Sequence, residues 1–215
     1  MNSRGTRTRE AIVDVAMRMA SMVGLEGLSI GALANKLGIS KSGLFGHFQS
    51  KENLQLAVLD AAEQAFVDDV VRPAVQAPRG LPRVRAMLER WLAWARGEGG
   101  CLFVSASAEL DDRPGPVRDH VVSSQRRWAE TLARAARIAV DEGHLVEEAD
   151  PEQLAFELYS LMLGAHHYYR LLADPATLDR VEAGFTSILA RVVRADITPP
   201  ALDRDVARLP VRELS

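Results

Sequence analysis

The chain has 215 residues, of which 47% are hydrophobic, and a formal net charge of −3 at pH 7. This length and apolar content suit one or two globular domains with a substantial core, and they exclude an intrinsically disordered chain. A single cysteine, Cys101, excludes an internal disulfide, and the N-terminus lacks the apolar run of a signal peptide. These features predict a cytoplasmic protein.

The charge is unevenly distributed along the chain. Residues 1–55 contain seven lysines and arginines against four acidic residues, a net charge of +3, which leaves −6 for the rest of the chain. A basic N-terminal part ahead of an acidic body is the distribution that steers an N-terminal domain towards a polyanion such as DNA.

The first predicted helix covers residues 8–23. Its apolar residues repeat at intervals of three and four, and Gly24 follows as a left-handed stop. Arg4, Arg7 and Arg9 form a basic arm at its start. Two interpretations stay open for this arm, namely a solvated terminus or a contact with phosphates or the minor groove.

Residues 29–51 predict a helix-turn-helix followed by a third helix. Ser29 can cap the first helix of this motif and Gly38 can end it. Ser40 can cap the second helix of the motif, and Ser50 can cap the helix that follows it. In the second helix of the motif, Leu44 and Phe48 are four residues apart and form the inward face.

The outward face of the second helix indicates contact with DNA. Lys41, Ser42 and Gly43 occupy its first turn, where small or cationic groups suit phosphates and base edges. Gly43 and Gly46 each cost about 0.5–1 kcal/mol relative to alanine inside a helix, so we expect them to permit a close approach. Lys51, at the start of the next helix, can reach a phosphate.

This stretch resembles the DNA-binding domain of the tetracycline-repressor-like (TetR) family of bacterial transcriptional regulators. That family commonly has a small residue, Gly, an aliphatic residue, Tyr, any residue, His and Phe, and then a Lys that opens the next helix. The corresponding residues here are Ser42, Gly43, Leu44, Phe45, Gly46, His47, Phe48 and Lys51. Phe45 is the departure, since it lacks the hydroxyl with which the family's tyrosine touches a phosphate. The predicted DNA-binding residues are Ser29, Ser40, Lys41, Ser42, Gly43, Phe45, His47 and Lys51.

The remaining chain predicts an all-α body. The third helix continues from Glu52 towards Val71, and prolines and a glycine between residues 73 and 82 then break the chain. Body helices are predicted at 82–96, 103–111, 116–142, 151–172 and 175–195. The predicted architecture is a three-helix helix-turn-helix DNA-binding domain (1–56), a helical effector-binding and dimerisation domain (57–198) and an irregular, solvated tail (199–215).

The most apolar stretch, residues 154–172, does not predict a membrane span. Glu157, His166, His167 and Arg170 interrupt it, so we expect a buried helix and no membrane partner. The two adjacent histidines would point about 100° apart on a helix, and a shared metal is therefore not expected. No catalytic motif is evident, and we expect no catalytic residue and no cofactor.

Aromatic and soft side chains in the body predict a small-molecule site. Tyr159, Met162, His166 and Tyr169 share one helix face with a polar edge, which is unusual for pure core, although packing of the core is the alternative for each residue. Few cations lie on this stripe, which favours an apolar effector. The predicted pocket residues are Trp91, Phe103, Trp128, Tyr159, Met162 and His166. The family resemblance also implies an effector cavity in this region.

The last two long helices predict a homodimer. The helix at 151–172 is apolar on nearly every side, and Gly164 and Gly184 would allow a close approach between helices. Packing of these faces within one subunit is the alternative. The predicted interface residues are Leu161, Gly164, Tyr168, Gly184 and Ile188.

Together these patterns predict a transcriptional regulator, most simply a repressor that leaves a palindromic operator in double-stranded DNA when a small molecule binds. The alternatives are a small all-α enzyme or ligand carrier whose helix-turn-helix serves packing only, and an architectural DNA-binding protein without an effector.

Overall fold

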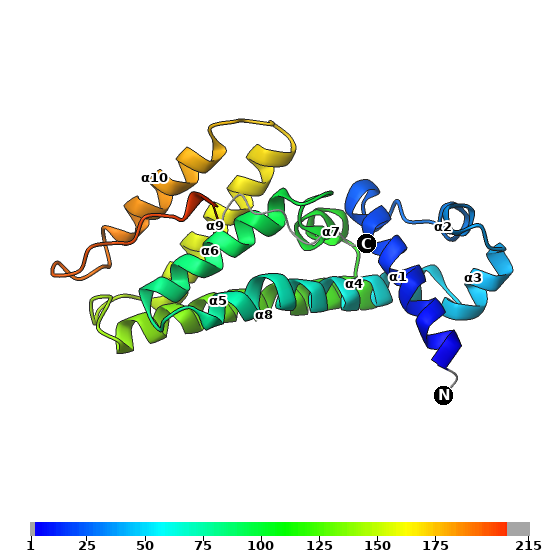
Figure 1. Ribbon diagram of the computed structural model, residues 1–215, viewed down its shortest axis with the longest axis horizontal. Helices are drawn as coiled ribbons and strands as arrows, with labels where there is room; N and C mark the ends of the chain where they lie inside the picture. The colour runs from blue at the N-terminus through cyan, green and yellow to red at the C-terminus, as the bar shows by residue number, and fades with distance from the viewer. Residues whose placement is uncertain (1–2, 206–215) are drawn as a thin grey trace. The chain divides into compact units, whose positions relative to one another are not determined.

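The computed structural model describes residues 3–205, with side chains from residue 7 onward. The regular elements of this range are helices (Figure 1), and a single antiparallel bridge joins Leu145 to Val193. The all-α prediction is therefore confirmed. The described residues divide into two compact units, residues 3–65 with 98–124, and residues 66–97 with 125–205.

The first unit contains the helix-turn-helix. Its elements are α1 (Ser3–Val23), α2 (Ile30–Leu37), α3 (Lys41–Phe48), most of α4 (Lys51–Phe66), α7 (Leu102–Leu110) and the start of α8 (Pro116–Asp141). The predicted division at residue 57 differs from this grouping, because residues 98–124 belong with the N-terminal helices. Helix α1 also begins earlier than predicted, so the basic arm is helical from residue 3.

Three serines precede helices α2, α3 and α4, as the sequence predicts. We call α2 and α3, the two helices of the helix-turn-helix, the reader. The backbone N–H of Ala32 donates to Ser29 Oγ at 3.1 Å, and that of Gly43 donates to Ser40 Oγ at 3.0 Å. Ser50 Oγ accepts from the N–H of Asn53 in the same way. Gly38 ends α2 in the left-handed region, with φ of 66°. Each cap satisfies a backbone donor that the helix itself leaves without a partner.

A small apolar core fixes the orientation of α2 and α3. Leu33 on α2 and Leu44 and Phe48 on α3 are buried, together with Ala16 and Ala20 of α1. The inward face that the spacing of Leu44 and Phe48 predicts is therefore confirmed, and the opposite face of α3 is left exposed.

The second unit is built from the C-terminal part of the chain and the segment before α7. Its elements are η1 (Val67–Val71), α5 (Arg72–Gln76), α6 (Leu81–Arg96), the rest of α8, α9 (Pro151–Arg170) and α10 (Thr177–Leu189). Helix α6 packs on α9, and α9 packs on α10 (Figure 1). Its buried core includes Leu88, Trp91, Leu132, Leu158 and Phe185.

Pro73 does not break the chain, contrary to the prediction. It lies at the start of α5, directly after the π-helical turn η1, and the helical path continues to Gln76. A proline is tolerated in the first turn of a helix because its missing N–H has no helical acceptor there. The break occurs at residues 77–80 instead, where Gly80 has φ of 84°.

Residues 199–203 of the predicted tail have no regular structure, and residues 204–205 are helical. The prediction that the tail is solvated is wrong for the described residues. Leu202 is buried, the N–H of Asp203 donates to the carboxylate of Glu89, and Arg204 bonds Glu182. These contacts attach residues 201–204 to α6 and α10. Residues 206–215 lie outside the described part of the chain.

Candidate nucleic-acid interface and effector site

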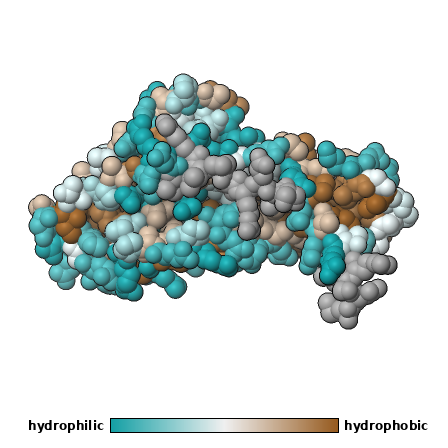
Figure 2. All heavy atoms as spheres, viewed as in Figure 1, coloured by the Kyte–Doolittle hydropathy of each residue, from teal (hydrophilic) through white to brown (hydrophobic). Residues whose placement is uncertain are grey.

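The exposed face of α3 carries the residues that the sequence assigns to DNA. Lys41, Ser42, Gly43 and Phe45 are exposed, and His47 is half-buried beside Phe48. Phe45 is 52% exposed to solvent, which is a large fraction for an aromatic residue. Figure 2 shows hydrophobic surface over α2 and α3, and Phe45 and Ile39 are the large exposed apolar residues there.

The two glycines of α3 differ in their surroundings. A Cβ at Gly46 would meet no other atom within 4 Å, so packing in this chain does not require a glycine there. A Cβ at Gly43 would lie 3.1 Å from Ser40 Oγ, the oxygen that caps the helix. Gly46 therefore costs helix stability without an internal compensation, which favours a close approach of another molecule to this face.

Ser29 and Ser40 have a structural role in the reader. Both hydroxyls accept the capping bonds described above, and Ser40 Oγ also lies 3.1 Å from Ser42 Oγ. Both residues are exposed at the starts of α2 and α3. Their predicted contacts with DNA stay a proposal.

Lys51 bonds within the first unit. Its ammonium donates to the backbone carbonyl of Glu26 at 2.6 Å and lies 3.8 Å from the Glu26 carboxylate. Since an ammonium has three donors, this contact leaves capacity for a phosphate. Gln55 donates to the carbonyl of Leu25 and to Glu26 Oε1. The start of α4 is therefore hydrogen-bonded to two residues of the α1–α2 loop.

Sequence reasoning missed that Glu26 is the centre of a polar network. Its backbone N–H lies outside any helix and donates to Glu109 Oε2 on α7 at 2.8 Å, and its carboxylate accepts from Arg113 at 2.9 Å. Gly24 beside it has φ of 82°, and a Cβ there would lie 2.0 Å from Glu109 Oε1. This network joins α7 to the loop that Lys51 contacts. No local pattern signals it, because its members are 25 to 87 residues apart.

The basic arm has one defined contact. The guanidinium of Arg9 lies over the ring of Phe48, 5.1 Å from its centroid, so it packs on the reader. Arg7 is exposed. The side chain of Arg4 lies outside the described residues.

Five of the six predicted pocket residues belong to the second unit. Trp91 on α6, Trp128 on α8, and Met162 and His166 on α9 are buried, while the half-buried Tyr159 donates to the amide oxygen of Gln125 on α8. Phe103 is buried on α7 in the first unit. Burial, and then the nearby charges of Arg170 and His167, lower the pKa of His166 to about 4, so its imidazole is neutral at pH 7.

The predicted dimer residues fall into two groups. Leu161 and Gly184 meet within one chain, where a Cβ at Gly184 would lie 2.9 Å from Leu161 Cδ1, and Ile188 is buried. Packing of α9 on α10 therefore accounts for Gly184. Gly164 and Tyr168 lie on an exposed face of α9 instead, and a Cβ at Gly164 would meet nothing within 4 Å.

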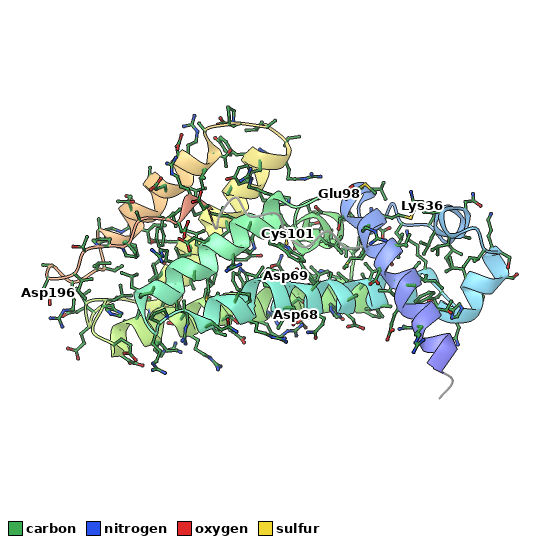
Figure 3. The ribbon with its side chains drawn as sticks, viewed as in Figure 1. Lys36, Asp68, Asp69, Glu98, Cys101 and Asp196 are labelled. Carbon is green, nitrogen blue, oxygen red and sulfur yellow. The ribbon has the colours of Figure 1, made fainter. Side chains whose placement is uncertain are left out.

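The described residues contain no group of three or more His, Cys, Asp or Glu side chains that could hold a metal ion. Cys101, labelled in Figure 3, is buried, as expected for a small apolar side chain. Within residues 3–205, no helix combines the length and apolarity that crossing a membrane requires.

Two family models match the chain in succession. Residues 12–58 match the model described as bacterial regulatory proteins, tetR family, and residues 80–185 match the tetracyclin repressor-like C-terminal domain. The chain belongs to the TetR family. The first match begins within α1 and ends in the middle of α4, so it includes α2 and α3. The second begins just before α6 and ends within α10, so the docked residues 201–204 lie beyond it.

Two distant relatives match more than half of the chain. The transcriptional repressor NemR of Escherichia coli K12 is 24% identical over 188 residues, 85% of this chain and 94% of NemR. The nucleoid occlusion factor SlmA of Vibrio vulnificus is 23% identical over 120 residues, 56% of this chain and 61% of the length of SlmA.

Solved structures of TetR-family regulators share the fold. A regulator from Chloroflexus aurantiacus superposes with a TM-score of 0.82 at 26% identity, covering 89% of this chain and 99% of its own. AibR, solved with isovaleryl coenzyme A and operator DNA, superposes with a TM-score of 0.67 at 21% identity, covering 85% and 96%.

The exposed ring of Phe45 provides a first prediction. Since TetR-family members resembling this segment have a tyrosine there, we expect Phe45→Tyr to bind operator DNA equally or up to about tenfold more tightly, the effect of one hydrogen bond to a charged group. Fluorescence anisotropy with labelled duplex would measure it. Phe45→Leu, which keeps an apolar side chain, should show no gain, and a several-fold loss for Phe45→Tyr would contradict the assignment.

Proposed function

We propose that this TetR-family protein is a transcriptional regulator that binds a palindromic operator as a homodimer and leaves it when a small-molecule effector binds. Repression is the simplest form of that activity. Its place of action would be the cytoplasm, where bacterial operator DNA lies. NemR is named as a repressor, and AibR was solved with both an acyl coenzyme A and operator DNA, so relatives of this fold support the proposal.

One observation carries the DNA-binding part. Helix α3 buries Leu44 and Phe48 and turns Lys41, Ser42 and Phe45 outward, at a helix start whose backbone N–H groups favour anions. A helix-turn-helix used only for packing has no reason to expose a phenyl ring and a glycine on this face. The arrangement suits insertion of α3 into the major groove.

The effector part rests on the second unit. Its core contains aromatic rings, a neutral His166 and the Tyr159–Gln125 hydrogen bond, which suits an apolar molecule with few polar groups. An effector that binds one conformation more tightly than the other needs about 1–3 kcal/mol of coupling to change operator affinity 5 to 150-fold.

The dimer part rests on the exposed face of α9. Its outward residues include Phe156, which is 67% exposed, together with Leu163, Gly164 and Tyr168. Large apolar side chains repeated along one exposed helix face are typical of an interface. A two-fold dimer would give two copies of α3 for the two halves of a palindrome.

Selection of genomic DNA fragments by the pure protein tests the function. We expect the retained fragments to share an inverted repeat with half-sites about 34–36 Å apart or a multiple of that spacing. Retention should fall steeply as salt rises, since phosphate contacts release counterions. Fragments retained without a shared sequence would indicate the architectural alternative, and no retention at low salt would favour the all-α enzyme or ligand carrier.

A further inference from the structure

Three aromatic side chains from separate segments of the second unit meet around Phe66. The ring centroids of Phe66 and Trp94 are 5.6 Å apart with an interplanar angle of 87°, and those of Phe66 and Trp128 are 5.0 Å apart at 89°. Phe66 is the last residue of α4, Trp94 lies on α6 and Trp128 lies on α8. We call these three residues the Phe66 cluster.

The cluster contains two buried hydrogen-bond donors without an acceptor. The indole Nε1 atoms of Trp94 and Trp128 are both inaccessible, and neither has a hydrogen-bond partner among the described residues. The whole side chain of Trp128 is only 5% exposed. A buried donor without a partner costs about 1–3 kcal/mol, so two donors beside one phenyl ring form an expensive arrangement for a core.

Two other polar side chains in the interior of this unit have hydrogen-bond partners. Tyr159 donates to Gln125, and the carboxylate of Glu89 accepts from the N–H of Asp203. The two indole N–H groups differ from Tyr159 and Glu89 in this respect. An indole N–H can only donate, so the chemical group that complements both is an acceptor.

The backbone next to the cluster is also irregular. The helix changes from α to π directly after Phe66, and the π turn η1 carries Asp68 and Asp69, labelled in Figure 3. Single π turns within helices are rare and are frequently found at functional sites. A ligand-binding site at Phe66 would account for the position of this π turn.

We infer that the Phe66 cluster is the polar recognition point for the effector, and that the effector is an uncharged, largely apolar molecule with a carbonyl oxygen that accepts from Trp94 and Trp128. This inference rests on the proposed function, since it names the ligand class of the same regulator. The cluster offers two neutral donors and no charge, so a buried carboxylate would lose its hydration without a counterion.

A matched pair of small ligands tests the inference. The ketone 1-indanone and the hydrocarbon indane have nearly the same shape and differ in one acceptor. We expect calorimetry on the intact protein to show 1-indanone binding about tenfold or more tightly than indane, the effect of roughly 1.4 kcal/mol. Indane-1-carboxylate should bind more weakly than the ketone.

Two tryptophan variants and one control locate the acceptor. Trp128→Phe and Trp94→Phe each remove one donor and keep an aromatic ring, and both should bring the ratio of ketone to indane affinity towards one while leaving indane binding unchanged. Phe185→Leu is the control, because Phe185 is a buried aromatic residue of the same unit, lies on α10 and has no ring contact with Phe66 among the described pairs. It should keep the ratio.

Several outcomes would overturn the inference. They are equal affinity for ketone and hydrocarbon, binding of neither, tighter binding of the carboxylate, or a ratio that survives in both Trp94→Phe and Trp128→Phe. The comparison of ligands on the unaltered protein needs no variant, so misfolding of one variant does not remove the test. Operator binding without ligand is measured separately, so a failure of the ligand class with intact DNA binding is distinct from a failure of the regulator.

Discussion

Replacement of Lys41 by alanine should weaken operator binding about tenfold at physiological salt and lower the slope of log affinity against log salt by about 0.9, the contribution of one phosphate contact. Lys41 lies exposed in the first turn of α3, and its side chain runs past Gly31 of α2, where a Cβ would lie 3.2 Å from Lys41 Cε. Lys41 therefore places a positive charge on the surface where α2 and α3 meet. The loss should be similar for all DNA sequences, because a phosphate contact carries no base information.

The matched control removes an exposed cation from the other unit. Arg134 on α8 is exposed, so Arg134→Ala changes net charge by the same amount as Lys41→Ala without touching the reader. Its affinity and salt slope should match those of the parent. Equal behaviour of the Lys41 and Arg134 variants would show that α3 does not contact the phosphates. Substitution of Ser42, in contrast, should change which sequence is preferred.

Lys51→Ala has two consequences in this structure. The variant loses a cation at the start of α4, and the α1–α2 loop also loses the bond from Lys51 to the Glu26 carbonyl. Its DNA affinity should therefore fall together with the thermal stability of the protein, whereas Lys41→Ala should leave stability unchanged. This contrast separates a phosphate contact from a structural one.

Local sequence signals account for most of the reader and for the order of the body helices. Ser29, Ser40 and Ser50 cap helices where the sequence places caps, because the caps depend on backbone donors only three residues away. The apolar spacing of Leu44 and Phe48 correctly predicts which face of α3 is exposed. Such features are set by neighbours in the chain, and a single sequence contains them.

Contacts between distant residues account for what the sequence did not predict. The partners of Glu26 and the rings around Phe66 come from separate helices, so no spacing along the chain indicates them. Gly184 is a similar case, since a helix-interior glycine signals a close approach but not whether the neighbour belongs to the same chain. Here the neighbour is Leu161 of the same chain.

The same reasoning makes Gly164 the better probe of the dimer. Gly164 lies on the exposed face of α9 with Phe156, Leu163 and Tyr168, and nothing in its own chain lies within 4 Å of its Cβ position. In an isolated chain, Gly164→Ala would stabilise α9 by about 0.5–1 kcal/mol, because alanine loses less backbone entropy in a helix. If a second copy packs closely on this face, the added methyl group instead weakens self-association. The sign of the change therefore reports whether another helix is present.

A charge at the same position should have the largest effect. We expect Gly164→Glu to sediment as a monomer at micromolar concentration and to lose specific operator binding at least a hundredfold, since two linked readers gain 10² to 10⁴ in avidity over one. Its helical content should stay normal, because Gly164 is exposed and a Cβ there meets no other atom within 4 Å. Arg134→Glu on α8 introduces the same side chain at another exposed position and should remain a dimer that binds DNA. A parent protein that is monomeric at this concentration would contradict the dimer. A Gly164→Glu variant that sediments as an unaltered dimer would place the interface elsewhere, because a buried carboxylate facing its symmetry mate cannot be accommodated at the two-fold axis.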